Sequence, residues 1–239
     1  MLASIIFGRE GSKSIKNKNL LNINGKTIME YPLMAIKKSN IADEMYVSTD
    51  SDRIFEVAKK YGCKLISRPE NLCSDTSLLL DAIIHAKNEI LKSNKQIEFL
   101  AINLCNAPNI TAETVIKAYQ KLKNNTELDS VISVSRYEMF SPERARKIND
   151  QGELVPYIPF EHFSNHVSCD RKSHDNTYFS DQGLTIVRVS ALENWEENLL
   201  PFQWMGKKIG YVEQESGGGD VDLPWQIGAI EYWLKNNPI

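Results

Sequence analysis

The chain has 239 residues, of which 42% are hydrophobic and 25% charged, and its formal net charge is −3. This is ordinary globular composition, and the length suits one α/β domain with an insertion. The slightly acidic balance argues against a nucleic-acid partner, and no run approaches the roughly 20 apolar residues of a membrane span. The N-terminus lacks the features of a signal peptide and the four cysteines form no CxxC pair, so we expect a cytoplasmic protein with reduced thiols.

Short apolar runs alternate with helical patterns through the first half of the chain. We expect strands at 2–7, 44–48, 63–67, 98–103 and 129–135, and helices at 28–38, 52–61, 76–93 and 111–123. Ser51 and Thr111 are the expected N-caps of the second and fourth helices, and Gly62 is expected to end the second. This alternation predicts a mostly parallel sheet flanked by helices, with ligands bound at the carboxyl ends of the strands.

The segment 137–180 interrupts this alternation. It is polar and irregular, with three prolines and several aromatic residues, which makes it too aromatic for a simple linker. We expect an inserted arm or lid within a single domain, 1–239, that packs against something such as a second subunit. Strands are expected again at 183–189 and 208–213, followed by a closing helix, 223–235, that buries Ile227, Ile230, Trp233 and Leu234.

A glycine turn directly follows the first expected strand, with the sequence Gly8-Arg9-Glu10-Gly11-Ser12-Lys13. Glycine lets the backbone approach a ligand closely, serine donates hydrogen bonds, and arginine and lysine supply positive charge. The spacing is neither that of a Walker A loop nor that of a dinucleotide fingerprint. On these residues alone, a phosphate site and a solvated turn both remain open.

The longer string from Ile5 to Leu20 resembles the opening of the acylneuraminate cytidylyltransferase family, the CMP-sialic acid synthetases and their relatives. The family pattern is an apolar strand followed by A-R-x-G/N-S-K-G-(I/L)-P-x-K-N-L, and the matching residues are Arg9, Ser12, Lys13, Lys18 and Asn19. Gly8, Ser14 and Lys16 replace the usual Ala, Gly and Pro.

Five further segments resemble the same family in the same order along the chain. They are Asn24-Gly25-Lys26 with Tyr31, Val47-Ser48-Thr49-Asp50, Ser67-Arg68-Pro69, Ser74-Asp75-Thr76, and Asp220-Val221-Asp222 with Pro224-Trp225. The resemblance spans essentially the whole chain and is weakest in 137–180. Ordered matches of this number are more specific than any single motif.

The resemblance implies a Rossmann-like fold of the nucleotide-diphospho-sugar transferase type, with an inserted dimerisation or lid arm. It implies transfer of CMP from CTP to the anomeric hydroxyl of an acidic keto-sugar, with release of pyrophosphate. Displacement at phosphorus requires positive charge held near the phosphate oxygens, so the residue types agree with this chemistry. The implied catalytic residues are Arg9, Lys13, Lys18 and Asp220, and the implied nucleotide-binding residues are Arg9, Gly11, Ser12, Lys13, Asn19, Ser48, Asp50 and Arg68. For Asp50, a helix-capping role remains an alternative.

Asp220 and Asp222 are the candidate ligands of a divalent metal, Mg²⁺. Carboxylates at positions i and i+2 of an extended segment point to one side, and Gly217, Gly218 and Gly219 precede them. Mg²⁺ prefers oxygen ligands and keeps waters and phosphates in its shell, so two aspartates together with CTP suffice. A solvated turn, or Asp222 as the N-cap of the closing helix, remains the alternative.

Two groups of residues in the arm are candidates for the sugar side of the site. Arg144 and Arg146 suit a sugar carboxylate, although a solvated charge run is the alternative. His162 and His166 have the spacing of a helical zinc site, but the segment is not helical in pattern. We therefore expect these histidines, with Cys169 and His174, to be arm residues that touch the sugar or are exposed, and their role stays open.

The chain departs from the family after the fourth strand, where many members carry Q-P-T-S-P-L-R. Here the residues are Leu104 to Ile110, and only Pro108 is retained, so the sugar-binding glutamine and the trailing arginine are absent. Asn106 offers an amide nearby. The acceptor therefore stays open among a sialic-acid-like nonulosonate, a 3-deoxy-octulosonate and a non-sugar acid, and a non-catalytic nucleotide-binding relative is a further alternative. We expect a homodimer without nucleic-acid or membrane partners.

Overall fold

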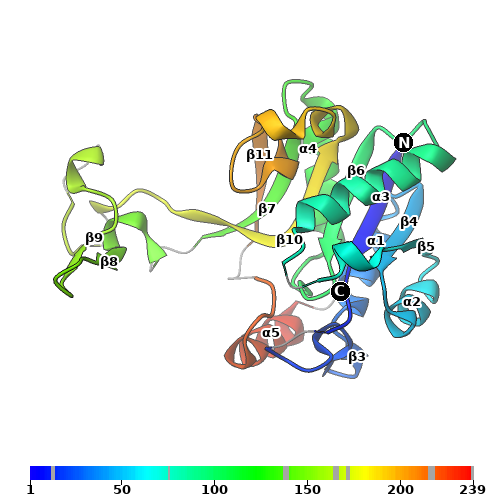
Figure 1. Cartoon of the computed structure of the whole chain (residues 1–239), viewed down its shortest axis with the longest axis horizontal. Helices are drawn as coiled ribbons and strands as arrows, with labels where there is room; N and C mark the ends of the chain where they lie inside the picture. Colours follow the sequence, from blue (N-terminus) through cyan, green and yellow to red (C-terminus); the bar gives the residue numbers. More distant parts are fainter. Residues whose placement is uncertain are drawn as a thin grey trace.

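The computed structural model describes residues 1–11, 14–74, 76–136, 140–163, 167–170, 173–214 and 219–237. A seven-stranded sheet in the order β11-β7-β10-β6-β1-β4-β5 forms its centre (Figure 1). Neighbouring strands run parallel, except that β10 is antiparallel to both β6 and β7. The predicted fold, a mostly parallel sheet flanked by helices, is confirmed.

The elements follow the expected order along the chain. The strands of the sheet are β1 (Leu2–Phe7), β4 (Glu44–Thr49), β5 (Lys64–Ser67), β6 (Phe99–Leu104), β7 (Ser130–Arg136), β10 (Tyr178–Arg188) and β11 (Ile209–Gln214). The α-helices are α1 (Glu30–Ser39), α2 (Asp52–Lys59), α3 (Leu79–Ser93), α4 (Ala112–Asn124) and α5 (Pro224–Asn236). Two short hairpins were not expected from the sequence, β2 (Asn22–Ile23) with β3 (Lys26–Thr27) and β8 (Arg146–Ile148) with β9 (Leu154–Pro156).

Alternating side chains of β1 anchor the two helical layers. Ala3, Ile5 and Phe7 belong to the apolar cluster that contains the buried face of α3. Leu2 and Ile6 point to the opposite face, into clusters that contain residues of α1, α2 and α4. Because successive side chains of a strand face opposite sides, one continuous apolar run fills both layers.

The predicted helix caps have different outcomes. The Thr111 hydroxyl accepts a hydrogen bond from Thr114 N (3.2 Å), so the predicted cap of α4 is confirmed. Ser51 occupies the N-cap position of α2, but its side chain makes no capping bond. Its backbone N–H instead donates to Thr49 Oγ1 (3.1 Å). Gly62, with φ of +90°, follows α2 in a conformation that glycine adopts without strain.

A separate apolar cluster joins the last helix to the region that follows β1. Its buried members are Ile23, Ile28, Tyr31, Val221, Ile230, Trp233 and Leu234, with Ile227 partly buried against them. Figure 1 shows α5 beside β3 at the end of the sheet where β1 finishes. The packing of α5 therefore brings residues near 220 to the segment that leaves β1.

The arm, residues 137–180, leaves the sheet between β7 and β10 and extends away from it (Figure 1). The β7–β10 pairing shifts register between Ser180 and Thr185, and the irregularity contains the buried Asp181. The Asp181 carboxylate accepts hydrogen bonds from Ser133 Oγ, Ser135 Oγ, Gln214 Nε2 and Gly183 N. Because β10 begins at Tyr178 and β8 and β9 pair within the arm, this segment is less irregular than its sequence indicates.

Within the described residues, no helix combines the length and apolar character that crossing a bilayer requires. All four cysteines are among these residues and carry free thiols.

Candidate functional site

A cleft of about 510 Å³ opens at the carboxyl ends of β1 and β6. Its floor includes Phe7, the last residue of β1, and Leu104, the last residue of β6, and the start of α3 forms one wall. Five of the residues singled out from the sequence line this cleft or its rim, namely Arg9, Lys18, Asn19, Arg68 and Asn106. The predicted location of the ligand site, at the strand ends, therefore coincides with a real cavity.

The glycine loop, residues 8–19, forms one side of the cleft and is held by polar contacts. Gly11 has a φ of +87°, a left-handed conformation that favours glycine. Asn19 Nδ2 donates to Arg9 O (3.0 Å), and Arg9 Nη1 donates to Cys73 O (3.0 Å). Asp50 Oδ1 accepts from Glu10 N (3.0 Å), so in this conformation Asp50 supports the loop. Ser12 and Lys13 lie outside the described residues.

The replacement of the family's alanine by Gly8 has a steric reason. A Cβ atom added at Gly8 would lie 2.5 Å from Cys105 Sγ, far inside a van der Waals contact. Cys105 is itself buried behind the cleft floor. The small residue at position 8 therefore makes room for the thiol.

Arg68 lies on the floor of the cleft and is largely buried. Its Nη2 donates to Ser48 O (2.6 Å), its Nε donates to Ser48 Oγ (3.2 Å), and its guanidinium lies 5.8 Å from the centre of the Phe7 ring. Ser48 has no exposed surface. In this arrangement Ser48 positions Arg68 and does not face the cleft, whereas Arg68 is one of the residues that line it.

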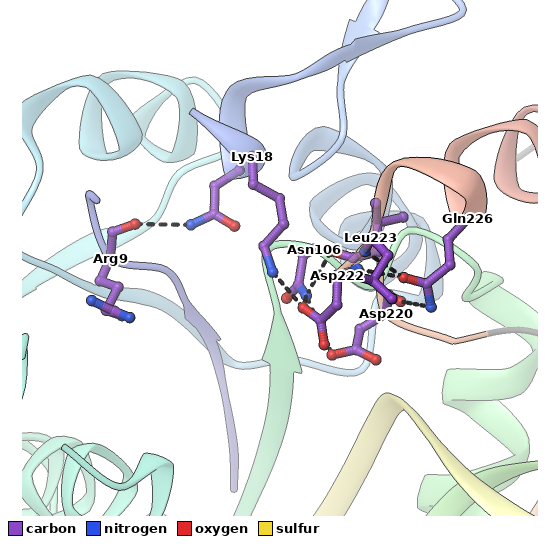
Figure 2. Close-up of polar contacts among 9 residues, drawn as sticks. Arg9, Lys18, Asn106, Asp220, Asp222, Leu223 and Gln226 are labelled. Carbon is purple, nitrogen blue, oxygen red and sulfur yellow. Dashed lines mark hydrogen bonds and ion pairs between the residues drawn. The ribbon is translucent and has the colours of Figure 1, made fainter. Parts of the chain in front are cut away.

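A segment near the start of the sequence and one near its end meet at Lys18. Its Nζ lies 2.5 Å from Asp222 Oδ1, although the two residues are 204 positions apart (Figure 2). Asn106 Nδ2 lies 3.3 Å from Asp220 Oδ2 and 3.3 Å from Asp222 Oδ1, and Val221 N donates to Asn106 O (2.8 Å). The glycine loop, the loop after β6 and the acidic pair thus converge at one point of the cleft rim.

The two carboxylates of Asp220 and Asp222 lie side by side in Figure 2. Val221 between them is fully buried in the apolar cluster under α5, so alternation along the extended segment turns both carboxylates the other way. Burial raises the pKa of the Asp220 carboxyl, and the neighbouring charge of Asp222 raises it further. A positive charge placed between the two carboxylates would relieve both effects.

The alternative assignment of Asp222 as the N-cap of the closing helix is wrong. Leu223 occupies the N-cap position of α5, and the Asp222 side chain is bonded to Lys18 and Asn106. The Asp222 backbone N–H is bonded to Gln226 Oε1 (2.8 Å). Its carboxylate is therefore directed to the cleft rim.

Arg144 and Arg146 lie on the arm, outside the cleft of their own chain. Arg146 Nη1 donates to Glu143 O (2.9 Å), and its guanidinium lies 5.4 Å from the centre of the Phe160 ring. A contact from these arginines to a ligand in the same chain's cleft does not occur in this conformation, because the arm carries them away from the sheet (Figure 1).

The histidines of the arm are not gathered around a metal site within the described residues, and His166 lies outside these. The two ring nitrogens of His174 have partners, Ser141 Oγ (3.2 Å) and Ser168 O (2.8 Å). His162 ends a short 3₁₀ turn at Phe160–His162. His174 thus links the Ser141 side chain to the backbone of Ser168 within the arm.

Sequence reasoning missed two residues that hold the acidic segment, residues 219–223. The Gln226 side chain makes three hydrogen bonds to the backbone of the acidic segment. Asn109 is fully buried and, with its amide oriented to match, pairs with both Gly219 N (2.9 Å) and Gly219 O (3.1 Å). A glutamine at the third position of a helix is a recognised capping signal when serine or threonine occupies the N-cap. Here Leu223 occupies the N-cap, so the signal cannot be recognised from the sequence.

Known proteins are similar to this chain in fold and in sequence. A solved structure of a CMP:2-keto-3-deoxy-manno-octonic acid synthetase complexed with CTP aligns with a TM-score of 0.69 at 18% identity, over 98% of each chain. The architecture is thus the Rossmann-like fold of nucleotidyltransferases.

Sequence comparison identifies the family. A family model described as "Cytidylyltransferase" matches residues 3–178. The chain is 30% identical to the pseudaminic acid cytidylyltransferase of Campylobacter jejuni, over 72% of this chain and 73% of that protein. It is 28% identical to 3-deoxy-manno-octulosonate cytidylyltransferase 2 of Hydrogenovibrio crunogenus, over 95% of each. The chain therefore belongs to the cytidylyltransferase family, enzymes that use CTP to transfer a nucleotidyl group.

Proposed function

We propose that this enzyme transfers CMP from CTP to the anomeric hydroxyl of an acidic keto-sugar of the nonulosonate type and releases pyrophosphate. The observation that supports this most directly is the contact between Lys18 and Asp222. It joins a cation-bearing glycine loop to an acidic pair at the rim of one cleft, and a nucleoside triphosphate with a divalent metal needs both.

The chemistry follows from these residues. The acceptor oxygen attacks the α-phosphorus of CTP, and the bond from that phosphorus to the pyrophosphate oxygen breaks. Arg9, Lys13 and Lys18 would hold the phosphate oxygens and balance the charge that develops on them. The proton of the acceptor hydroxyl passes to a base, for which we propose Asp220, a carboxylate at the rim of the cleft.

The acidic pair suits Mg²⁺. Two carboxylates on one side of an extended segment are hard oxygen ligands, and Lys18 Nζ and Asn106 Nδ2 already place donors where a cation would be attracted. Among the described residues, no group of three or more His, Cys, Asp or Glu side chains could hold an ion, so Asp220 and Asp222 would share it with phosphate and water oxygens. When bound, Mg²⁺ supplies positive charge to the reacting phosphates.

We infer the chemical class of the acceptor from the names of similar proteins. One similar protein is named for pseudaminic acid, a second for 3-deoxy-manno-octulosonate, and a third, from Escherichia coli, for N-acylneuraminate at 29% identity over 56% of this chain. The acid named in each case is a keto-sugar acid. We favour a nonulosonate and keep 3-deoxy-octulosonate as the second candidate, since that relative matches 95% of the chain.

We further propose a cytoplasmic homodimer in which the arm contacts a second copy. Ile148 and Leu154, on the paired strands β8 and β9, are each 72% exposed, and Phe140 and Tyr157 are exposed nearby. Large apolar side chains gathered on one projection mark a protein-protein surface. Because Arg144 and Arg146 lie away from their own cleft, they would reach a sugar carboxylate only in the cleft of a partner.

The test is pyrophosphate release by the purified protein with CTP, Mg²⁺ and a panel of acceptors. The panel contains N-acetylneuraminic acid, pseudaminic acid, 3-deoxy-octulosonate and a non-sugar keto acid, and ATP, GTP and UTP replace CTP in parallel. Release with CTP and a nonulosonate alone supports the proposal. Release only with 3-deoxy-octulosonate would replace the acceptor, and CTP binding without turnover of any acceptor would indicate a non-catalytic relative.

A further inference from the structure

We propose that Gln226 is a positioning residue that holds Asp220 and Asp222 in the geometry a divalent cation requires. The inference rests on the proposed function, because it assigns a role to Gln226 toward the metal of that reaction. Gln226 does not itself touch the reacting atoms.

Among the residues that the structure describes, the side chain of Gln226 is bonded to the backbone of the acidic segment. Its Oε1 accepts from Asp222 N (2.8 Å) and from Leu223 N (2.6 Å), and its Nε2 donates to Asp220 O (3.1 Å) (Figure 2). The three bonds span both aspartates. They fix the peptide groups on either side of Val221 relative to the first turn of α5.

The position of Gln226 explains why one side chain can do this. It is the third residue of α5, where the first backbone N–H groups of the helix have no partner within the helix. Leu223 at the N-cap has no polar side-chain atom. The side chain of Gln226, within the first turn, therefore supplies the capping contact to the N-cap backbone. An ordinary capping glutamine needs only the N-cap N–H, whereas this one also reaches Asp222 and Asp220.

The acidic segment needs such support because its charges repel each other. Asp220 is partly buried beside Asp222, and the segment follows residues 215–218, which include two glycines. Asn106 holds the Val221 backbone through Val221 N (2.8 Å) and Val221 O (3.3 Å), so without Gln226 the Asp220 and Asp222 peptides would keep only this support from the loop after β6. Asn109 holds Gly219 and Val221 is packed under α5, but neither bonds to the backbone of Asp220 or Asp222 through its side chain.

Residues that orient metal ligands change metal affinity roughly 10- to 100-fold when they are removed. A glutamine adds a property that a carboxylate at this position lacks. Its amide nitrogen donates to Asp220 O, and its neutrality leaves the acidic pair as the only negative charge contributed by this segment. Q226A therefore removes all three bonds, whereas Q226E keeps the two acceptor contacts, removes the Nε2 bond and adds a negative charge to the segment.

The experiment measures Mn²⁺ binding without nucleotide, by the EPR signal of the free ion, and the Mg²⁺ concentration for half-maximal pyrophosphate release at saturating CTP. Q226A should weaken Mn²⁺ binding and raise the half-maximal Mg²⁺ concentration by roughly 10- to 100-fold, with kcat at saturating Mg²⁺ much closer to wild type. Q226E, which retains both acceptor contacts to Asp222 N and Leu223 N, should show a smaller shift than Q226A.

The matched control is N236A, at the other end of the same helix. Asn236 Nδ2 donates to Tyr232 O (2.7 Å), so this variant also removes a side-chain bond at a helix terminus. N236A should leave both metal measurements at their wild-type values. Equal shifts in Q226A and N236A, or unchanged metal binding in Q226A, would overturn the positioning role.

Failure of this inference is distinct from failure of the proposed function. A wild-type protein that neither binds Mn²⁺ nor releases pyrophosphate would remove the metal site and the positioning role with it. A wild-type protein that does both, together with a Q226A variant of unchanged metal affinity, would remove the positioning role alone. If Q226A does not fold, Q226E decides, because its carboxylate still caps α5: a shift in Mn²⁺ affinity supports the positioning role, and unchanged affinity would overturn it.

Discussion

The apolar residue beneath the acidic pair is buried, whereas apolar residues of the arm are exposed. Beneath the cleft rim, Val221 is fully buried against Ile23 and the helix α5, and the acidic pair is held above it. On the arm, Ile148 and Leu154 are 72% exposed. Val221 thus completes its packing within one chain, whereas the arm exposes side chains that another surface would cover. We therefore expect single substitutions at the cleft rim to change turnover of CTP. We expect substitutions on the arm to change the association of two copies.

The largest effect is expected at Asp222. Asp222→Asn keeps the shape of the side chain but removes the charge that faces Lys18, and we expect pyrophosphate release to fall by about 1,000-fold. The measurement is the steady-state rate at saturating CTP and Mg²⁺. Asp150→Asn, an exposed aspartate of the arm, is the control and should stay within about twofold of wild type. Full turnover by Asp222→Asn would remove Asp222 as a metal ligand.

Lys18 should give the next largest effect. Lys18→Met preserves the length of the side chain but loses the ammonium group, and we expect kcat to fall by about 100-fold. In the same variant, Mn²⁺ binding without nucleotide should not weaken, because the ammonium group no longer competes for Asp222. The control is Lys16→Met in the same loop, where the side chain is exposed. Equal rates in the two variants would contradict a role of Lys18 at the phosphates.

The arm is tested by charge introduced into its apolar surface. Ile148→Glu combined with Leu154→Glu should raise the dimer dissociation constant by at least about tenfold, measured by light scattering over a dilution series. CTP binding, followed calorimetrically, should stay unchanged because the cleft lies within one chain. Leu200→Glu, another exposed leucine, serves as the control. A protein that is monomeric without any substitution would show that the arm has a different partner.

The smallest effect concerns Glu44, at the end of the strands that lies away from the cleft. Lys64, Tyr46 and Asn94 donate to the Glu44 carboxylate and lower its pKa to about 2. Because the folded-state pKa is lowered, the stabilisation is present above the unfolded-state value near 4.5 and is lost as the pH falls toward 2. Glu44→Gln should therefore lower the free energy of unfolding by roughly 1–2 kcal/mol at pH 7, after allowance for solvent screening.

Urea unfolding at several pH values measures this effect. The difference between wild type and Glu44→Gln should shrink steadily below pH about 4.5. Turnover at pH 7 should not change, because Glu44 begins β4 and the cleft lies at the other end of the strands. A difference in unfolding free energy that is independent of pH would assign the stabilisation to packing and not to charge.

Much of the sheet could be predicted because each of its elements has a local signal. The apolar run of β1 is long enough for a strand and too short for a helix, and the Thr111 hydroxyl caps α4 as its position indicates. Ser51 shows the limit of such signals, since it occupies the N-cap position of α2 without a capping bond from its side chain. The short hairpin β2–β3 was missed because two-residue strands in a polar loop have no periodicity to detect.

The candidate site was predicted in part. The glycine loop, Arg68 and the acidic pair were visible as residue types at suitable positions, and Arg9, Lys18 and Arg68 do line the cleft. That Ser48 supports Arg68 from a fully buried position, and that Gln226 and Asn109 hold the acidic segment, could not be predicted. These roles depend on which backbone groups lie within reach after folding.

The sequence by itself determined the order of the α-helices and of the strands of the main sheet, and the i, i+2 spacing that turns the two aspartates to one side, because these features depend on neighbours a few residues away. Only the tertiary structure decided that Lys18 meets Asp222 across 204 positions and that Arg144 and Arg146 lie outside their own cleft. The physical reason is packing. Burial of Val221, Ile230 and Trp233 against Ile23 and Tyr31 fixes where the last helix lies, and no local pattern encodes which apolar surfaces will meet.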